Sequence, residues 1–307
     1  MNRGNGRMRA YAGYIFSSIL FGINGIVASY IHLASSEIVL FRTWIGGIFL
    51  VLLFGLGKYR FTFYQYKKEC AFIGIAGLAM GASWMFLYEA YQQVGVSIAT
   101  LTYYSGPILV MALAPVVYKE RITWKKLVGF AAVVLGLLWI VGGDNWDIRY
   151  NTWGLVCGFS AAAMYAVMVL FNKRAVHIRG MENTILQLAA AGVLVSVFVG
   201  VRVGWPEVQR EEEWIPILVL GVINTGIGCY FYFSSIGNLP VQTVAVCGYL
   251  EPLFAVLFSA LFLGERLAGI QLLGVAFMIA GAVYSEVWGA PQKECMKTAV
   301  PYDRQLE

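Results

Sequence analysis

The chain has 307 residues, of which 59% are hydrophobic and 13% are charged, and its formal net charge is +5. With a mean hydropathy of +0.70, it carries more apolar surface than a soluble domain of this length can bury in one core. The composition therefore excludes a soluble protein, and the modest positive charge does not require a nucleic-acid partner.

Ten apolar stretches follow one another along the chain, each about 18–23 residues long and so able to cross roughly 30 Å of hydrocarbon as a helix. They are Tyr11–Ile31, Ser36–Leu56, Cys70–Tyr91, Ser97–Tyr118, Trp124–Val141, Thr152–Phe171, Met181–Val203, Trp214–Ser235, Val241–Leu263 and Ala268–Val287. The segments between them are short and leave no room for a soluble domain. The sequence predicts an all-α membrane protein with ten transmembrane helices, whose function depends on side chains inside or beside the lipid bilayer.

A hydrophobic hairpin occurs twice between Val96 and Ser285, and its two copies align without a gap at an offset of 145 positions. The aligned pairs are Tyr104 with Tyr249, Pro107 with Pro252, Glu120 with Glu265, Arg121 with Arg266, Gly129 with Gly274 and Gly136 with Gly281. Because each copy belongs to a unit of five spans, an odd number, the second unit must be inverted in the membrane. We expect repeats at residues 11–142 and 152–287, followed by a cytoplasmic tail at 288–307. Inverted repeats are typical of transporters that alternate access around a midplane site.

The basic residues indicate how the chain is oriented. If the N-terminus is cytoplasmic, most Lys and Arg residues of the loops and tails lie on the cytoplasmic side, as the positive-inside rule expects. The outer loops then hold only Arg149, Arg202, Arg210 and Arg266. Since the number of spans is even, the sequence predicts that both termini are cytoplasmic.

The motifs give no support to metal, disulfide or enzyme chemistry. The five cysteines contain no CxxC pair, and the two histidines, His32 and His177, lie at span ends without a second ligand at metal-binding spacing. No HExxH motif, Ser–Lys pair or pair of aspartates lies within the spans, so we expect no cofactor and no enzyme activity. The acidic run 211–213, with Glu207, is interpreted as a solvated loop cluster rather than a cation-attracting vestibule.

Ionisable residues within spans cost about 2.5–3.5 kcal/mol or more near the bilayer centre, so they indicate function. Glu251 is the deepest acid, and its aligned partner is Gly106. It is a candidate for binding a cationic group or a proton, with a structural carboxylate as the alternative. Arg42 aligns with Gln187 and is a candidate for receiving a substrate carboxylate. The alternatives for Arg42 are snorkelling to the surface or pairing with Glu37.

Aromatic and polar residues recur on single helix faces. Trp84, Tyr88 and Gln92 are spaced four residues apart, and so are Asn224, Gly228 and Tyr232. Polar-tipped rings suit a flat or cationic solute through stacking or cation–π contact, although they also form interface belts and pack between helices. The candidate substrate-binding residues on these and neighbouring spans are Trp84, Tyr88, Glu89, Tyr104, Asn224, Tyr232 and Tyr249.

Pro107 and Pro252 occupy matched mid-span positions in the two copies. A proline lacks the N–H that a helix interior uses, so each one frees backbone carbonyls and permits a kink. Broken or kinked helices often flank the substrate site of a transporter. The two prolines are candidate hinges, with simple helix packing as the alternative.

The two hairpins read YSGPILVMALAPVVYKERITWKKLVGF and YLEPLFAVLFSALFLGERLAGIQLLGV. They resemble the paired motifs of the EamA-type members of the drug/metabolite transporter superfamily, in which a mid-span proline precedes Glu-Arg. The resemblance implies a ten-helix fold of two inverted five-helix repeats, a bacterial inner-membrane location and small-metabolite transport, often export. Matching positions, including the arginine of LFRTWIGG, are Arg42, Pro107, Glu120, Arg121, Glu251, Pro252, Glu265 and Arg266. Glu89 departs from the pattern, because an apolar or aromatic residue is expected there.

We therefore expect a secondary transporter that exports a small metabolite, such as an amino acid or organic amine, across the cytoplasmic membrane by alternating access. Glu251 would bind a cationic group or a coupling proton, and Arg42 a carboxylate, in a cavity between the two halves. The Glu-Arg pairs at 120–121 and 265–266 would anchor helix ends at opposite membrane faces. The alternatives are a non-transporting membrane scaffold and a drug or quaternary-amine efflux carrier. Substrate identity, transport direction and oligomeric state stay open, with a homodimer as one option.

Overall fold

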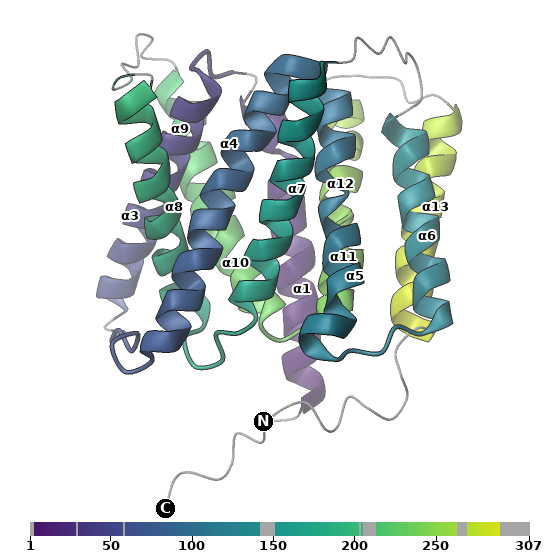
Figure 1. Ribbon diagram of the computed structural model, residues 1–307, viewed down its shortest axis with the longest axis horizontal. Helices are drawn as coiled ribbons and strands as arrows, with labels where there is room; N and C mark the ends of the chain where they lie inside the picture. Colours follow the sequence, from purple (N-terminus) through teal and green to yellow (C-terminus); the bar gives the residue numbers. More distant parts are fainter. Residues whose placement is uncertain are drawn as a thin grey trace, which may run out of the picture.

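The computed structural model describes residues 3–28, 30–57, 59–141, 151–202, 204, 213–262 and 269–288. Over these residues the regular structure is helical, and α1 begins at the face where α13 ends (Figure 1). We call this end of the bundle the N-terminal face and the opposite end the far face. Seven described stretches are long and apolar enough to cross a membrane, and two shorter apolar helices add to further spans. The chain is an all-helical multi-pass membrane protein, as predicted.

The first repeat supplies five spans. Their helices are α1 (Arg3–Gly22), α2 (Asn24–Ala28), α3 (Ser35–Leu56), α4 (Lys67–Tyr103), α5 (Gly106–Tyr118) and α6 (Trp124–Val141). The third span and the start of the fourth, predicted as separate helices, share α4, which has 37 residues. Because about 20 residues suffice to cross a bilayer, α4 is long enough to turn over at the far face and run back toward α5, as Figure 1 shows.

The second repeat supplies the other five spans. Their helices are α7 (Thr152–Asn172), α8 (Gly180–Arg202), α9 (Trp214–Leu218), the π-helix η2 (Val219–Ile227), α10 (Gly228–Ile236), α11 (Val241–Cys247), α12 (Leu250–Phe262) and α13 (Gly269–Trp288). The eighth span is built from α9, η2 and α10, and the ninth is divided between α11 and α12. The predicted spans are therefore present, but several of them are broken inside the bundle.

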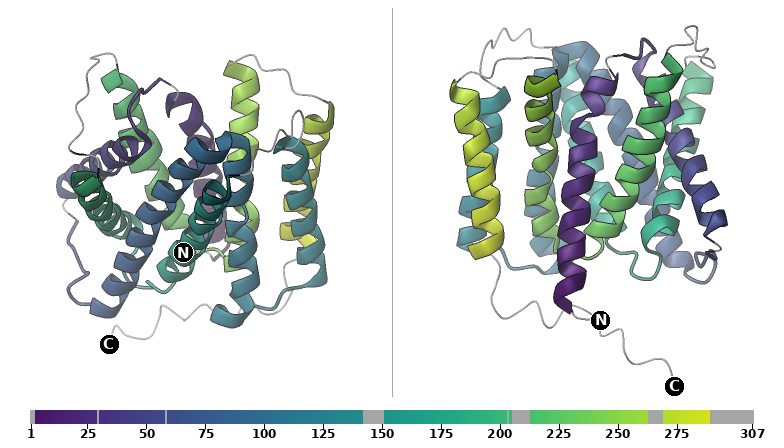
Figure 2. Two further views of the ribbon diagram at one scale, coloured as in Figure 1. Left: turned by 45° about the horizontal axis from the view of Figure 1, so that its top comes forward. Right: turned by 180° about the vertical axis from the view of Figure 1, so that it is seen from behind.

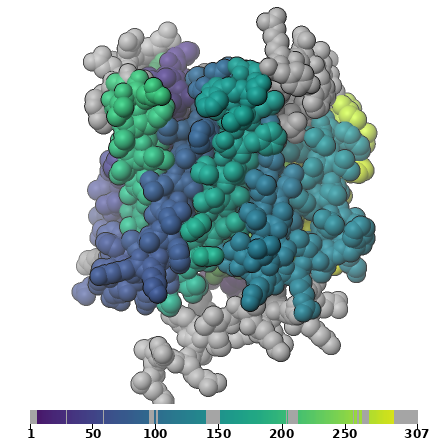
Figure 3. All heavy atoms as spheres, viewed as in Figure 1, coloured from purple at the N-terminus to yellow at the C-terminus, as the bar shows by residue number. Residues whose placement is uncertain are grey.

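The two repeats interlock helix by helix. The most extensive contacts pair α4 with α7 and α8, α6 with α13, α3 with α8 and α1 with α10, and each pair joins the first repeat to the second. The view from behind in Figure 2 shows α1 between α10 and the ninth span. On the face drawn in Figure 3, side chains of α4, α7, α5 and α6 follow one another in a continuous surface. A site at the centre of this bundle is consequently built by both repeats.

Glycines let α6 and α13 touch through their backbones. A Cβ atom on Gly129 would lie 2.7 Å from the carbonyl oxygen of Gly281, and one on Gly136 would lie 2.5 Å from that of Gly274. Since Gly129 aligns with Gly274 and Gly136 with Gly281, each contact is the repeat-related copy of the other. This reciprocal pattern is what a twofold relation between inverted repeats produces. Close backbone approach at small residues is the main way in which helices gain packing energy in lipid.

Gly136→Leu is expected to lower the stability of the protein in detergent by about 1–3 kcal/mol, the usual cost of overpacking a tight contact. The reason is that the new side chain meets a backbone carbonyl, which cannot move aside as a flexible side chain can. Thermal unfolding of the purified protein measures the effect. Gly74→Leu is the matched control, because nothing lies within 4 Å of a Cβ atom at that position. Equal losses in the two variants would contradict the prediction.

Candidate functional site

The fourth and ninth spans are both broken at the aligned tyrosines. Tyr104 lies in the turn between α4 and α5, and Tyr249 lies in the turn between α11 and α12. Pro107 and Pro252 fall in the first turn of the helix that follows each break. The first turn has no intrahelical partner for its N–H groups, so a proline there costs little. The bend predicted at the prolines is thus a complete interruption of each helix one turn earlier.

Each break leaves backbone carbonyls without a helical hydrogen-bond donor. Because lipid offers no donor, other groups of the protein must bond to these carbonyls. The Tyr249 hydroxyl donates a hydrogen bond of 2.8 Å to the Tyr104 carbonyl, linking the two breaks across the repeat axis. The Tyr14 hydroxyl of α1 donates to the Val244 carbonyl of α11 at 3.2 Å. Tyr249 and Tyr104 are both buried. The structure therefore places these two predicted site residues side by side and gives the Tyr249 hydroxyl a structural partner.

Tyr249→Phe is expected to destabilise the protein by about 1–3 kcal/mol, the cost of leaving a buried carbonyl without its donor. Tyr104→Phe serves as the matched control at the aligned position, since the Tyr104 hydroxyl bonds no described residue. Thermal unfolding in detergent compares the two variants. A loss for Tyr104→Phe as large as that for Tyr249→Phe would show that the Tyr249–Tyr104 hydrogen bond is not the cause.

Glu251 is the second residue of α12 and follows the ninth-span break directly. Its side chain is partly buried, and its carboxylate forms no hydrogen bond or ion pair with another described residue. The cation that acts on it electrostatically is Arg42. The phenols within its electrostatic reach are those of Tyr14, Tyr103, Tyr104 and Tyr165. The carboxylate thus faces an aromatic interior with polar tips and the positive charge of Arg42.

Arg42 of α3 points into the same interior. It is only 4% exposed, its Nε donates to Thr225 Oγ1 at 2.9 Å, and its guanidinium carbon lies 4.4 Å from the centroid of the Trp84 ring. Among the described residues, its Nη groups have no hydrogen-bond partner. Glu37 instead accepts a bond of 2.8 Å from the Ala34 amide. Arg42 therefore neither snorkels to the surface nor pairs with Glu37, and it keeps one edge of its guanidinium free.

The π-helix η2 positions the partners of Arg42 and of the first span. The Thr225 hydroxyl donates to the Leu220 carbonyl five residues earlier, at 2.8 Å, which suits the wide turn of a π-helix. Asn224 donates to the Leu20 carbonyl at 2.9 Å and to Asn24 Oδ1 at 2.8 Å, where α1 gives way to α2. Short π-helical segments are often found at functional sites. Sequence reasoning identified Asn224 but missed Thr225, because hydropathy does not reveal a π-helix.

Four tyrosines, Tyr14, Tyr103, Tyr165 and Tyr232, lie next to one another and form an aromatic wall of this interior. The rings of Tyr14 and Tyr232 lie 5.4 Å apart, and the Tyr232 and Tyr165 hydroxyls are 3.3 Å apart. The ring of Tyr103 is 5.8 Å from that of Tyr165. Sequence reasoning included Tyr232 and missed Tyr14 and Tyr165, which lie on the first and sixth spans. Those spans hold the same place in the two repeats, but the two tyrosines do not align with each other, so the repeat did not mark them. We call Arg42, Glu251, Trp84 and this wall the central site.

Two predicted site residues lie elsewhere. Tyr88 packs with apolar residues of α3 and α8. Glu89 Oε1 accepts hydrogen bonds from Gln93 Nε2 at 2.9 Å and from Trp153 Nε1 at 3.3 Å, at the contact between α4 and α7. Trp84 shares that apolar cluster with Tyr88 but also contacts the Arg42 guanidinium, whereas Tyr88 and Glu89 have no described contact with Arg42 or Glu251.

Other polar groups hold loops and helix ends. Glu120 accepts from the amides of Val241 and Gln242, and His32 Nδ1 lies 3.0 Å from Glu213 Oε1. Within the described ranges, no group of three or more His, Cys, Asp or Glu side chains is placed to hold a metal ion. Several residues considered above lie outside the described ranges. They are Arg149, Glu207, Arg210, Glu211, Glu212, Glu265, Arg266 and the tail after Trp288.

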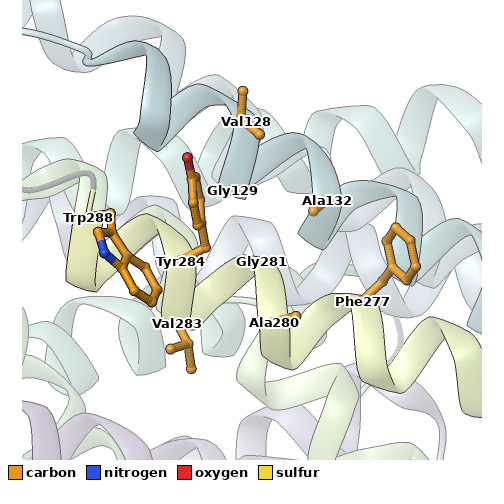
Figure 4. A pocket seen from close by; sticks show the side chains of 9 residues that line it. All are labelled: Val128, Gly129, Ala132, Phe277, Ala280, Gly281, Val283, Tyr284 and Trp288. Carbon is orange, nitrogen blue, oxygen red and sulfur yellow. The ribbon is translucent and has the colours of Figure 1, made fainter.

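A groove separate from the central site opens along α6 and α13 (Figure 4). It encloses about 490 Å³. Its lining is almost wholly apolar and consists of Val128, Gly129, Ala132, Phe277, Ala280, Gly281, Val283, Tyr284 and Trp288. Because it offers no charged group, it is not a candidate for binding a polar solute.

An inverted-repeat bundle with broken helices around buried charges defines a transporter rather than an enzyme. The chain belongs to the EamA-like transporter family, which it matches over residues 8–142 and 152–285. It is 24% identical to the uncharacterized transporter YxxF of Bacillus subtilis (strain 168) over 270 residues, covering 87% of this chain and 86% of YxxF. It is 26% identical to the threonine/homoserine exporter RhtA of Salmonella typhimurium (strain LT2) over 253 residues, covering 80% of this chain and 79% of RhtA.

The fold also matches a known structure. One crystal structure superposes with a TM-score of 0.78 at 15% sequence identity, covering 94% of this chain and 98% of the other. This likeness supports the fold alone, since the sequence identity is too low to indicate a shared substrate. The chain is therefore a multi-pass EamA-family transporter.

Proposed function

We propose that the protein exports a small zwitterionic metabolite, an amino acid of modest size, through the central site. The observation that carries the proposal is that Arg42 and Glu251 present opposite charges to one aromatic interior without forming an ion pair with each other. The relatives named threonine/homoserine exporters support the same class of solute and the direction.

The chemistry of the two charges fits an amino acid. A carboxylate can accept hydrogen bonds from the free edge of the Arg42 guanidinium, since Thr225 holds only Nε. An ammonium group can bind the Glu251 carboxylate and the faces of neighbouring rings. Each buried charge costs free energy while it is unpaired. A zwitterion pairs with both charges and so offsets both free-energy costs. A solute with one charge satisfies only one.

Access to the central site would alternate between the two membrane faces. One repeat would rock against the other, with the breaks before Pro107 and Pro252 as hinges, because interrupted helices lack the hydrogen bonds that keep a helix stiff. We place the protein in the cytoplasmic membrane with both termini inside, on the distribution of Lys and Arg. Protons are a candidate coupling ion at Glu251.

Purified protein in liposomes tests the proposal. Labelled threonine and homoserine are expected to cross the bilayer faster than through empty liposomes. The corresponding amino alcohol, which lacks the carboxylate, and the hydroxy acid, which lacks the amine, are expected to compete at least about 10-fold less well, because each leaves one buried charge unpaired. Equal competition by either analogue would remove the assignment of a zwitterion.

A drug or quaternary-amine efflux carrier is the second candidate. The tyrosines around Glu251, with Trp84 beside Arg42, favour it, since aromatic rings bind quaternary ammonium groups. In that case a permanent organic cation would be transported and threonine would not compete with it. Absence of flux for both kinds of solute would favour the non-transporting scaffold.

A further inference from the structure

The groove along α6 and α13 lies on the outer side of the bundle. On the side of α13 that faces the bundle, Glu286 bonds groups of α1 and α11. The groove uses another face of the same helix, on which the lining residues recur at intervals of three and four: Phe277, Gly281, Tyr284 and Trp288. The three aromatic side chains of this set are exposed. Because both helices belong to membrane spans, the groove opens to lipid.

The shape of the groove suits a hydrocarbon chain. Its floor has no side chains, because a Cβ atom on Gly129 would lie 2.7 Å from the Gly281 carbonyl oxygen. At its deep end the rings of Phe277 and Trp139 pack 4.7 Å apart. From Phe277 to Trp288 the groove runs for about 16 Å along the helix axis. A volume of about 490 Å³ over that length gives a mean width of about 6 Å, which is too narrow for a helix about 10–12 Å across.

A lysine stands at the mouth of the groove. Lys125 precedes Val128 and Gly129 by three and four residues, so it lies on the face of α6 that lines the groove. Its side chain is exposed, and it forms no hydrogen bond or ion pair with another described residue. The adjacent Lys126, by contrast, is buried in the bundle and pairs with Glu286. The positive charge of Lys125 is therefore available to an anion at the mouth.

Two aromatic residues mark the depth of this mouth. The rings of Tyr284 and Trp288 lie 5.6 Å apart in the last turns of α13, which ends at the N-terminal face. Figure 4 shows both at one end of the groove and Phe277 at the other. Tyr and Trp gather where the hydrocarbon meets the lipid headgroups. Lys125, in the first turn of α6 at the same face, thus lies at the level of the lipid phosphates.

We propose that this groove binds one anionic phospholipid from the leaflet at the N-terminal face. One acyl chain would fill the hollow between the aromatic ends, and the phosphate would bind Lys125. A lipid fits better than a second copy of the chain, because the hollow is narrower than a helix and its mouth carries a positive charge without a counter-charge. Since α6 ends the first repeat and α13 ends the second, the lipid would hold the two repeats together. Nothing in this proposal depends on the solute at the central site.

Native mass spectrometry of the full-length protein, freed of copurified lipid in detergent, measures the binding. Phosphatidylglycerol and phosphatidylcholine with the same acyl chains are added in turn. The first phosphatidylglycerol is expected to bind about fivefold more tightly than the first phosphatidylcholine, which is the contribution of one lysine beside an anionic lipid. Glycerol 3-phosphate, which offers the phosphate without chains, should neither bind nor displace phosphatidylglycerol, because the groove holds the chain.

Ala280→Leu tests the part of the site that holds the chain. Ala280 lines the groove, so the larger side chain would occupy the hollow. The first phosphatidylglycerol is expected to bind at least about 10-fold more weakly, since each acyl methylene that leaves the groove loses its share of the binding. Ala276→Leu makes the same change on an exposed residue of α13 outside the groove and should leave the affinity unchanged.

Lys125→Gln tests the part that holds the phosphate. This variant is expected to bind phosphatidylglycerol and phosphatidylcholine equally well, because the acyl chain still fits and the charge is gone. Lys68→Gln is the matched control, since Lys68 is exposed in the first turn of α4 at the same face. It should keep the fivefold preference of the parent.

Thermal unfolding in detergent shows whether each variant is folded and adds a second measurement. Phosphatidylglycerol should raise the Tm of the parent and of Ala276→Leu, but not that of Ala280→Leu, because a ligand stabilises only the folded state that binds it. Equal affinity of the parent for the two lipids, or equal losses in Ala280→Leu and Ala276→Leu, would overturn the proposal. A dimer in the mass spectrum that Ala280→Leu dissociates would assign the groove to a second copy of the chain instead.

Discussion

Glu251→Gln is expected to lower the rate of threonine flux at low substrate concentration by about 100-fold, since removing one partner of a buried charged contact costs about 2–5 kcal/mol. The physical reason is that the substrate ammonium loses its counter-charge in an interior that water does not replace. Initial rates in proteoliposomes measure the effect, and Glu251→Asp is expected to keep part of the activity because it keeps the charge.

Glu89→Gln is the matched control for that result. It makes the same chemical change on a carboxylate that bonds Gln93 and Trp153 at the contact between α4 and α7, and it is expected to transport within about twofold of the wild type, as surface changes usually do. Measuring exchange of internal for external threonine without a pH gradient separates binding from proton coupling. If Glu251→Gln transports as well as the wild type, Glu251 is not part of the site.

Arg42→Gln is expected to raise the KM for amino acids by about 100-fold, since a hydrogen bond to a charged group is worth about 1.5–3 kcal/mol and the guanidinium offers two N–H donors. It places in the first repeat the residue that the second repeat has at Gln187. Amines without a carboxylate are expected to be affected much less, since they gain nothing from Arg42. Competition against labelled threonine measures both effects.

Arg202→Gln is the control for general loss of positive charge, because Arg202 ends α8 with an exposed side chain. Thr225→Val is a second check, since it removes the acceptor of the Arg42 Nε bond without changing charge, and Thr225→Ser is expected to restore function. An equal loss for amines and amino acids in Arg42→Gln would mean that the residue supports the fold rather than the carboxylate.

The two charged residues of the central site could be predicted from the sequence. Glu251 and Arg42 stand out because the repeat does not duplicate them, and the structure places both in one interior. Tyr88 and Glu89 share their helix with Trp84, yet only Trp84 contacts Arg42, while Tyr88 packs with α3 and α8 and Glu89 bonds Trp153 of α7. In a membrane protein both the lipid and the core are apolar, so helical spacing groups residues on a face without saying where that face points.

The positions of the breaks in the spans, and the hydrogen bonds made there, could not be predicted from the sequence. Pro107 and Pro252 signalled a disturbance, but the break lies before each of them, where Tyr249 binds the Tyr104 carbonyl. The long helix α4 joins two predicted spans, since it contains no proline that would stop it at the far face. Such outcomes depend on partners from the other repeat.

The sequence by itself determined the membrane class, the ten apolar spans and their duplication, because hydropathy and an offset of 145 positions are local properties of the chain. Only the tertiary structure decided that Arg42 bonds Thr225 and that Tyr14 and Tyr165 join the site. The contacts of Arg42 with Thr225 and of Tyr14 with Tyr232 each join the two repeats, whereas Tyr165 bonds Tyr232 within the second repeat. Interleaving two inverted halves brings together residues that neither helical spacing nor alignment places in contact.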